Sequence, residues 1–243
     1  MIGYGIETFG ELNAEDYDET QDPGTTDQCV ALISEIAGTA SILEFAIGTG
    51  RIALPLVAKG HSVAGIESSP KMVEKLREKP GGSGIEVHMG DMSSARVNGS
   101  FGHVCLVFNT LFNLTSQQAQ IACFQNAAAH LDVGGTFLVE TFVPKTDHFV
   151  NHQTVQTRHL KMDSVWIEAI QHDPVRQVLD FQRIRYSPEG TKLVPLTMRY
   201  AHIPELDVIA QLAGLRLRDR WGGWDKRGFD KDSTMHISVY EKI

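Results

Sequence analysis

Short apolar runs alternate with amphipathic stretches through the middle of the chain. Continuous apolar runs of this length are typical of strands that are covered on both faces of a sheet. The predicted strands are residues 41–45, 62–66, 85–89, 103–108 and 136–142. Helix start and stop signals predict helices at 27–37, 51–59, 70–79 and 116–131. The alternation indicates an α/β fold whose core, residues 41–143, contains a doubly wound, mostly parallel sheet.

The pattern changes after residue 143. Apolar and polar residues alternate with period two in the segments 153–159, 165–172, 178–186 and 193–200. We therefore expect residues 144–200 to form an antiparallel β insertion after the fifth strand, acting as a lid or as a dimer contact. Residues 201–243 are predicted to add a helix and two strands, which complete a seven-stranded sheet with an antiparallel C-terminal hairpin.

Residues 1–40 are predicted to form an N-terminal arm and the first helix. The first 26 residues are mostly polar and acidic, and they carry several aromatic side chains, including Tyr17. Two interpretations stay open. The arm is either solvated, or it folds over a ligand site and brings Tyr17 to that site.

Composition and charge narrow the classes of function. The hydrophobic content of 42% over 243 residues supports a full core, and the net charge of −8 disfavours a nucleic-acid backbone as partner. The chain has no long apolar run and no signal-peptide pattern at its start, so no membrane segment is expected. Its three cysteines are widely spaced and are expected to be reduced, which predicts a cytoplasmic location. No metal site is predicted, because His148 and His152 form only an isolated pair.

A glycine-rich turn joins the first two predicted strands. Gly48 and Gly50 allow the backbone to approach a ligand closely. The helix that begins near Arg51 points its first N–H groups at the same place. Glu67 ends the second strand, where a carboxylate can accept hydrogen bonds from a ribose diol. The unit therefore predicts a nucleotide-type pocket at the carboxyl ends of the strands.

Two ligands fit this pocket. Residues 48–53 satisfy G-x-G-x-x-G/A, which is a weak signal for a dinucleotide. Glu44 favours a different ligand, because its carboxylate repels a pyrophosphate and attracts a cation. S-adenosylmethionine is such a ligand, since it carries a sulfonium, an amino group and no phosphate.

These features resemble the class I S-adenosylmethionine-dependent methyltransferases. The family's first motif, [D/E]-x-G-x-G-x-G, is similar to residues 44–50, in which Ala46 replaces the first glycine. The other matching motifs, in the family's order, are Glu67 after strand 2, Gly90-Asp91 after strand 3, residues 104–109 at strand 4 and residues 134–135 before strand 5. The resemblance covers residues 40–143 well and 200–243 moderately. Residues 109–113 are not the Asn-Pro-Pro-Tyr sequence of enzymes that methylate nucleobase amines, so the resemblance implies the small-molecule type.

The resemblance and the strand ends together define an expected site. The expected cofactor-binding residues are Tyr17, Glu44, Ala46, Gly48, Gly50, Arg51, Glu67, Ser68, Met72, Gly90, Asp91, Met92, Phe108 and Asn109. The expected acceptor-binding residues are Phe112, Asn113, Phe142, Arg158 and Trp224. A sulfonium is already a strong leaving group, so the enzyme need only align the acceptor and exclude water. If a base is required, His148 and Tyr17 are the candidates.

Three functions fit these residues. The leading hypothesis is transfer of a methyl group from S-adenosyl-L-methionine to an O or N atom of a small-molecule acceptor, by a cytoplasmic enzyme that could be a homodimer. The second hypothesis is an NAD-dependent oxidoreductase, motivated by residues 48–53. The third is a non-enzymatic S-adenosylmethionine-binding module, motivated by the lack of an obvious base.

Overall fold

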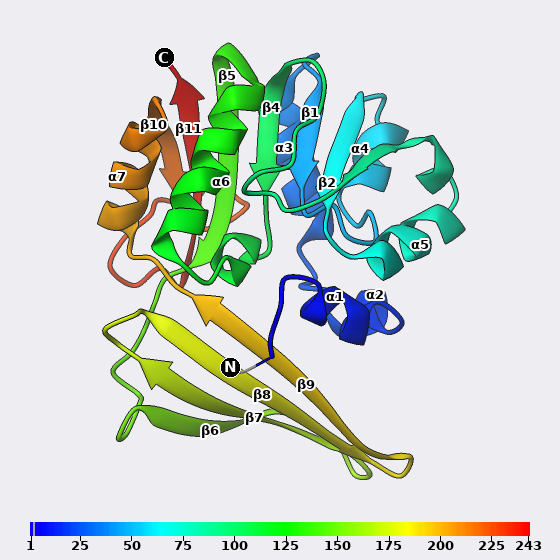
Figure 1. Ribbon diagram of the computed structural model, residues 1–243, viewed down its shortest axis with the longest axis vertical. Coiled ribbons are helices and arrows are strands. Elements are labelled where there is room, and N and C mark those ends of the chain that lie inside the picture. Colours follow the sequence, from blue (N-terminus) through cyan, green and yellow to red (C-terminus); the bar gives the residue numbers. More distant parts are fainter. Residues whose placement is uncertain (2) are drawn as a thin grey trace.

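The fold combines a large helix-covered sheet with a smaller antiparallel sheet. The structure is a computed structural model that describes residue 1 and residues 3–243. Figure 1 shows the smaller sheet below the large one, with the two N-terminal helices between them. The arrangement leaves the carboxyl ends of the parallel strands facing the N-terminal helices.

The large sheet has seven strands in the order β10-β11-β5-β4-β1-β2-β3. Their bounds are β1 Ile42–Phe45, β2 Val63–Glu67, β3 Glu86–Met89, β4 Phe101–Leu106, β5 Leu131–Phe142, β10 Leu215–Trp221 and β11 Met235–Lys242. Strands β1 to β5 pair in parallel, and β11 runs antiparallel to both β5 and β10. The predicted mostly parallel seven-stranded sheet with an antiparallel C-terminal hairpin is therefore confirmed.

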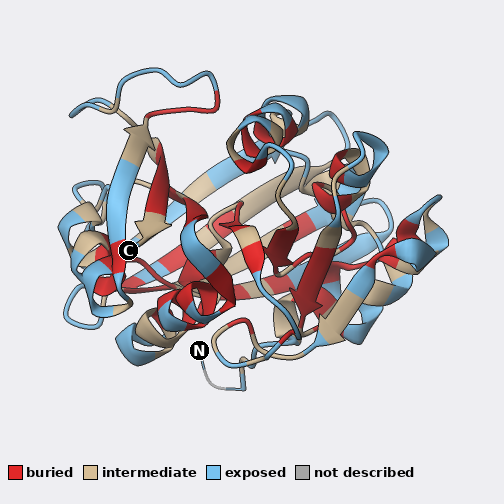
Figure 2. Ribbon diagram, turned by 90° about the horizontal axis from the view of Figure 1, so that it is seen from above, coloured by how far each residue is buried: buried red, intermediate tan, exposed pale blue. Residues whose placement is uncertain are grey.

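Helices cover both faces of this sheet. Their bounds are α3 Thr26–Ala37, α4 Ala53–Ala58, α5 Pro70–Glu78, α6 Gln117–His130 and α7 Ile203–Leu212. Helices α6 and α7 pack on one face, and α3 and α4 pack on the other. Figure 2 shows the buried strands at the centre and the exposed outer sides of the helices. In the described part of the chain, no helix has both the length and the hydropathy needed to cross a membrane.

The predicted β insertion is also confirmed. It forms a four-stranded antiparallel sheet of β6 Gln153–Leu160, β7 Val165–Asp173, β8 Val178–Ser187 and β9 Gly190–Arg199, paired in that order. Ile170, Phe181 and Leu196 stand opposite one another across β7, β8 and β9, and all three are buried in the main core cluster. One face of the insertion therefore shares the core of the large sheet.

The N-terminal arm forms two short helices, α1 Thr8–Asn13 and α2 Tyr17–Thr20. Helix α1 contacts both α5 and β9, so the arm lies between the two sheets. The solvated arm that the sequence left open is not what the structure shows. Several predicted bounds also shift. Helix α4 is shorter than residues 51–59, β4 is Phe101–Leu106 in place of residues 103–108, and β5 starts at Leu131 because Leu131 pairs with Phe101.

Candidate functional site

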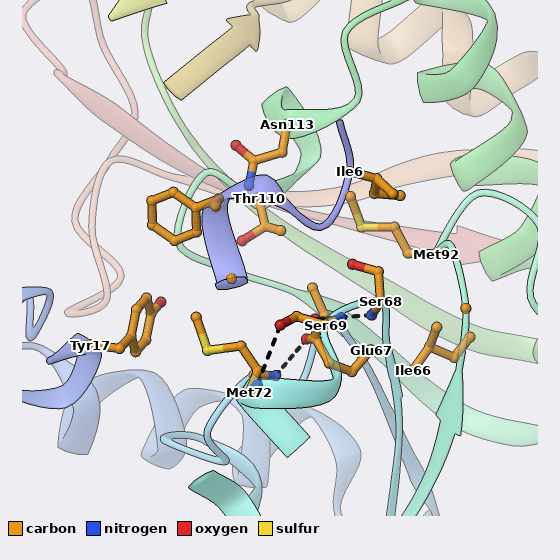
Figure 3. Close-up of a pocket in the computed structure, with 15 residues that line it drawn as sticks. Ile6, Tyr17, Ile66, Glu67, Ser68, Ser69, Met72, Met92, Thr110 and Asn113 are labelled. Atoms are coloured by element: carbon orange, nitrogen blue, oxygen red, sulfur yellow. Dashed lines mark hydrogen bonds between the residues drawn. The ribbon is translucent and has the colours of Figure 1, made fainter. Parts of the chain in front are cut away.

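A cavity of about 640 Å³ lies at the carboxyl ends of β1 and β2. The arm forms one wall with Ile6, Phe9, Gly10 and Tyr17, and the strand ends and α5 form the opposite wall. Figure 3 shows Tyr17 and Glu67 on different sides of this cavity.

A second cavity of about 310 Å³ adjoins the first. The residues that line both cavities are Tyr17, Ala46, Gly48 and Thr110. The second cavity also reaches Glu44, Arg51 and Phe108. The combined site therefore has one acidic side chain in each part, Glu67 in the first cavity and Glu44 in the second.

The glycine-rich turn has positive φ angles at Ala46 (53°), Gly48 (57°) and Gly50 (81°). A Cβ atom on Gly48 would meet no atom closer than 3.9 Å, so this backbone faces open space in the cavity. A Cβ atom on Gly50 would lie 2.3 Å from Leu76 Cδ1. Gly50 is therefore needed for packing against α5. The sequence predicted that Gly50 would contact the cofactor, but Gly50 lines neither cavity. Ala46 takes a left-handed conformation that is costly for a residue with a Cβ.

Three backbone N–H groups hold the Glu67 carboxylate. Oε2 accepts a hydrogen bond from the Gly48 N–H at 2.9 Å, and Oε1 accepts from the N–H groups of Ser68 at 2.9 Å and Ser69 at 2.8 Å. Burial raises the pKa of Glu67, and these N–H groups oppose that rise. A carboxylate accepts about four hydrogen bonds, so little capacity is left for a ligand. Glu67 thus fastens the turn to β2 as well as facing the cavity.

Glu44 is a buried carboxyl group with an unpartnered oxygen. The residue is 3% exposed, and no described donor hydrogen-bonds to its Oε2 atom. Burial raises the pKa of Glu44 to about 8, although the Arg51 guanidinium and the Ala53 N–H act in the opposite direction. An orphaned buried acceptor is costly, and a cation that enters the second cavity would remove that cost. This part of the site therefore suits the ammonium group of S-adenosylmethionine.

Two consecutive residues after β4, Phe108 and Asn109, have positive φ angles of 60° and 62°. The Glu140 carboxylate accepts the Phe108 N–H at 2.6 Å, and the Glu140 carbonyl accepts the Asn109 N–H at 3.2 Å. Phe108 lines the second cavity below the Arg51 guanidinium, which lies 5.1 Å from the ring centroid. Asn109 does not line the cavities, because its Oδ1 atom accepts the Phe142 N–H at 2.6 Å. Glu140 was not predicted as a site residue, and its only signal was a single acid in the apolar run of β5.

The expected adenosine end includes Met72 from α5 and Gly90 and Met92 from the segment after β3, and all three line the first cavity. Ser68 lines the same cavity beside Glu67. Asp91 does not line it. The Oδ1 atom of Asp91 accepts the Ser93 N–H at 2.7 Å, and the residue lines a neighbouring cavity of about 580 Å³. The structure thus gives Asp91 a turn-capping contact, and its expected contact with the cofactor stays a prediction.

The two candidate bases differ in location. Tyr17 lines both cavities, and burial raises its pKa to about 12. A phenol with this pKa stays protonated at neutral pH, so it can donate a hydrogen bond but cannot serve as a resting base. His148 is exposed on the connection between β5 and β6, where its ring stacks on Phe149 at 4.2 Å, and it lines neither cavity.

The expected acceptor residues are not gathered in one place. Asn113 lines the first cavity and the cavity beside Asp91, and its Oδ1 atom is buried without a partner. Phe112 is fully buried and packs edge-to-face on Phe142 with ring centroids 4.9 Å apart, and neither ring lines the two adjoining cavities.

The remaining two expected acceptor residues line neither of the two adjoining cavities. Arg158 is exposed on the insertion and lies 3.7 Å from the Glu168 carboxylate. Trp224 is 6% exposed in the core cluster formed around α3, and its side chain lies beside Glu140. Their expected contact with an acceptor is therefore not supported by the position of either residue.

The cavity residues that the sequence did not predict come mainly from the arm and the helix starts: Ile6, Phe9, Gly10, Ser69 and Thr110. Spaced aromatic residues were the only signal for the arm. Among residues 1 and 3–243, no group of three or more His, Cys, Asp or Glu side chains is placed to hold a metal ion. The site instead combines fixed backbone N–H groups, two buried carboxyl groups and an apolar cover.

Comparisons with known proteins agree with this geometry. The family described as methyltransferase domain matches residues 42–135. The CcbJ methyltransferase from Streptomyces caelestis is 35% identical, and its structure superposes with a TM-score of 0.93 over 98% of this chain and 99% of that chain. No curated protein matches the sequence.

Two more distant structures share the fold. CalS10, an amino pentose methyltransferase from Micromonospora echinaspora, is 18% identical, with a TM-score of 0.72 over 94% of this chain and 95% of that one. The sugar N-methyltransferase KedS8 from a Streptoalloteichus species is 16% identical, with a TM-score of 0.69 over 100% of this chain and 96% of that one.

Proposed function

The chain belongs to the S-adenosylmethionine-dependent methyltransferases, and we propose that it transfers the methyl group to an O or N atom of a small-molecule acceptor. Its cofactor is S-adenosylmethionine, so the dinucleotide that residues 48–53 left open is set aside. The observation that carries the placement of the cofactor is the unpartnered, buried Oε2 atom of Glu44 in the second cavity.

The chain's own residues suit the two ends of this cofactor. Glu44 would receive the amino group, and Gly48 presents open backbone between the two cavities. The remaining acceptor capacity of Glu67 would take a ribose hydroxyl, and Met72 and Met92 would cover the adenine. When bound, S-adenosylmethionine supplies an activated methyl group on a sulfonium.

The protein contributes positioning and exclusion of water. Phe9 and Tyr17 of the arm close the site from one side, and their rings meet edge-to-face with centroids 6.2 Å apart. The Tyr17 hydroxyl stays protonated and can donate a hydrogen bond. Of the two candidate bases, Tyr17 lacks the protonation state and His148 the position of a resting base, which suits a reaction driven by alignment.

We take the acceptor to be a small molecule with an N–H or O–H group. The unpartnered Oδ1 atom of Asn113 supports this, because it can accept a hydrogen bond from such a nucleophile in the cavity. The fold is also shared with proteins described as amino pentose and sugar N-methyltransferases. Residues 144–200 would cover the acceptor or form a dimer contact.

The predicted cytoplasmic location and the homodimer also remain part of the proposal. Cys29, Cys105 and Cys123 are free thiols and all are buried, which fits a reducing compartment. The exposed edge strand β6 of the insertion could pair with that of a second copy.

Calorimetry combined with a methyl-transfer screen tests the proposal. S-adenosylmethionine and S-adenosylhomocysteine should bind, NADH should not, and label from the methyl donor should reach an amine or hydroxyl acceptor. The matched variant Glu44→Gln should weaken binding, whereas Glu241→Gln, at the far end of β11, should not. Binding of NADH without binding of S-adenosylmethionine would contradict the proposal.

A further inference from the structure

The acidic arm rests on a row of lysines along α5. Lys71, Lys75 and Lys79 are spaced four residues apart, which places them on one side of the helix and its C-cap. Each lysine has a partner in the arm: Glu11 to Lys71 at 3.1 Å, Glu15 to Lys75 at 2.9 Å and Asp18 to Lys79 at 2.5 Å. The arm therefore sits on α5 through ion pairs along its length.

The last of these pairs also reaches the glycine-rich turn. The Thr49 hydroxyl donates to Asp18 Oδ1 at 2.6 Å, and Lys79 Nζ donates to the Thr49 carbonyl at 2.7 Å. Thr49 is 1% exposed and stands between Gly48 and Gly50. Asp18, Thr49 and Lys79 thus form a closed triad that joins the arm, the turn and the end of α5.

The same arm covers the larger cavity. A Cβ atom on Gly10 would lie 2.4 Å from Ser69 Cβ, so α1 lies directly on the first turn of α5 beside Glu67. Phe9 and Tyr17 line the cavity on either side of this contact. A ligand in the cavity is covered by the arm, and movement of the arm must break the contacts of Asp18 with both Thr49 and Lys79.

We infer that Asp18 and Lys79 are positioning residues, which hold the Thr49 turn in its binding conformation while the arm is closed and thereby slow the departure of the bound nucleoside. The inference rests on the proposed function, because it takes the two cavities to be the S-adenosylmethionine site. It predicts that dissociation depends on ionic strength, since the lysine row and its partners are partly exposed and are screened by salt.

The expected size of the effect follows from exposure. The side chains of Asp18 and Lys79 are 45% and 28% exposed, which weakens their direct ion pair. Their hydrogen bonds to the buried Thr49 are screened less. We expect loss of either charge to speed dissociation by about three- to tenfold, which is below the range for fully buried hydrogen bonds to charged groups because both side chains are partly exposed.

The test is stopped-flow measurement of S-adenosylhomocysteine dissociation in the full-length protein, at salt concentrations from about 50 to 500 mM, a range over which screening changes strongly. The variants are Asp18→Asn, Lys79→Gln and the double variant. Asp232→Asn and Lys231→Gln are matched controls, because they remove the same charges from an exposed ion pair. Hydrogen exchange of residues 8–20 reports whether the arm opens more often.

Wild type should release the ligand faster as salt rises. Asp18→Asn and Lys79→Gln should release it faster at low salt and depend less on salt, and their effects should not multiply in the double variant. Both controls should match wild type. Rates within twofold of wild type in the test variants, equal changes in the controls, or faster hydrogen exchange without faster release would each overturn the inference. Failure of wild type to bind S-adenosylhomocysteine at all would instead contradict the proposed function.

Discussion

Replacing Glu44 by glutamine tests the electrostatics of the cofactor site. Burial raises the pKa of Glu44 to about 8, so roughly nine in ten side chains carry a proton at pH 7. An ammonium group beside Oε2 favours the carboxylate, so binding at pH 7 should release about 0.9 proton from wild type. Glu44→Gln has the same shape and no proton to lose, so its binding should release none from this position.

The proton count comes from calorimetry of S-adenosylhomocysteine binding in buffers with different ionisation enthalpies. The observed enthalpy should vary with buffer for wild type at pH 7 and much less for Glu44→Gln. The ratio of the dissociation constants, variant over wild type, should also rise about tenfold from pH 7 to pH 9, as the ionised fraction of Glu44 rises from roughly 0.1 to 0.9. This ratio cancels the titration of the ligand itself. Equal proton release in both proteins, or a ratio that does not change with pH, would show that Glu44 does not exchange its proton for the ligand's ammonium group.

Further predictions follow from the same contacts. Burial raises the pKa of Glu44 from its ordinary value of 4.5 to about 8 in the folded state. As the pH rises from 4.5 to about 8, the free energy of unfolding of wild type should therefore fall relative to that of Glu44→Gln by about 1.4 kcal/mol per pH unit, which urea titrations can measure. Both oxygens of Glu67 accept backbone N–H groups, so in Glu67→Gln the amide NH₂ must face one of these donors. Glu67→Gln should therefore weaken S-adenosylhomocysteine binding nearly as much as Glu67→Ala, by about tenfold or more, and calorimetry that finds binding by Glu67→Gln unchanged would contradict this. Ala46→Gly should raise the free energy of unfolding by up to about 1 kcal/mol, by relieving a left-handed alanine, and a fall in melting temperature would count against that explanation. Neither Tyr17 nor His148 is a resting base, so Tyr17→Phe should keep the wild-type pH profile of kcat between about pH 6 and 9, and His148→Ala should keep kcat within about twofold of wild type. If either variant loses a rise or fall of kcat with pH that wild type shows, that residue does act as a base.

The central sheet could be predicted because its strands are continuous apolar runs. Val104 to Leu106 and Phe137 to Val139, for example, are almost completely buried, and covering both faces requires such runs. The insertion was predictable for a related reason, since its period-two alternation matches one buried and one exposed face. Local pattern and tertiary structure agree in these segments.

The arm was less predictable, because α1 and α2 have too few residues to show a helical period. Their order comes from contacts that are distant in sequence, such as Asp18 with Lys79 and Gly10 with Ser69. The roles of individual site residues were hard to predict for the same reason. Gly50 looks like a ligand-approach glycine until the position of Leu76 is known, and Trp224 looks like an acceptor contact until the fold buries it beside Glu140.

A crystal structure of the protein with S-adenosylhomocysteine would show directly whether Glu44 receives the amino end of the cofactor. We predict that the amino group of the ligand lies within about 2.7–3.2 Å of the Glu44 carboxylate, with the ribose beside Glu67 and the arm closed over both. A ligand whose amino group lies away from Glu44, or that binds outside the two adjoining cavities, would contradict this placement.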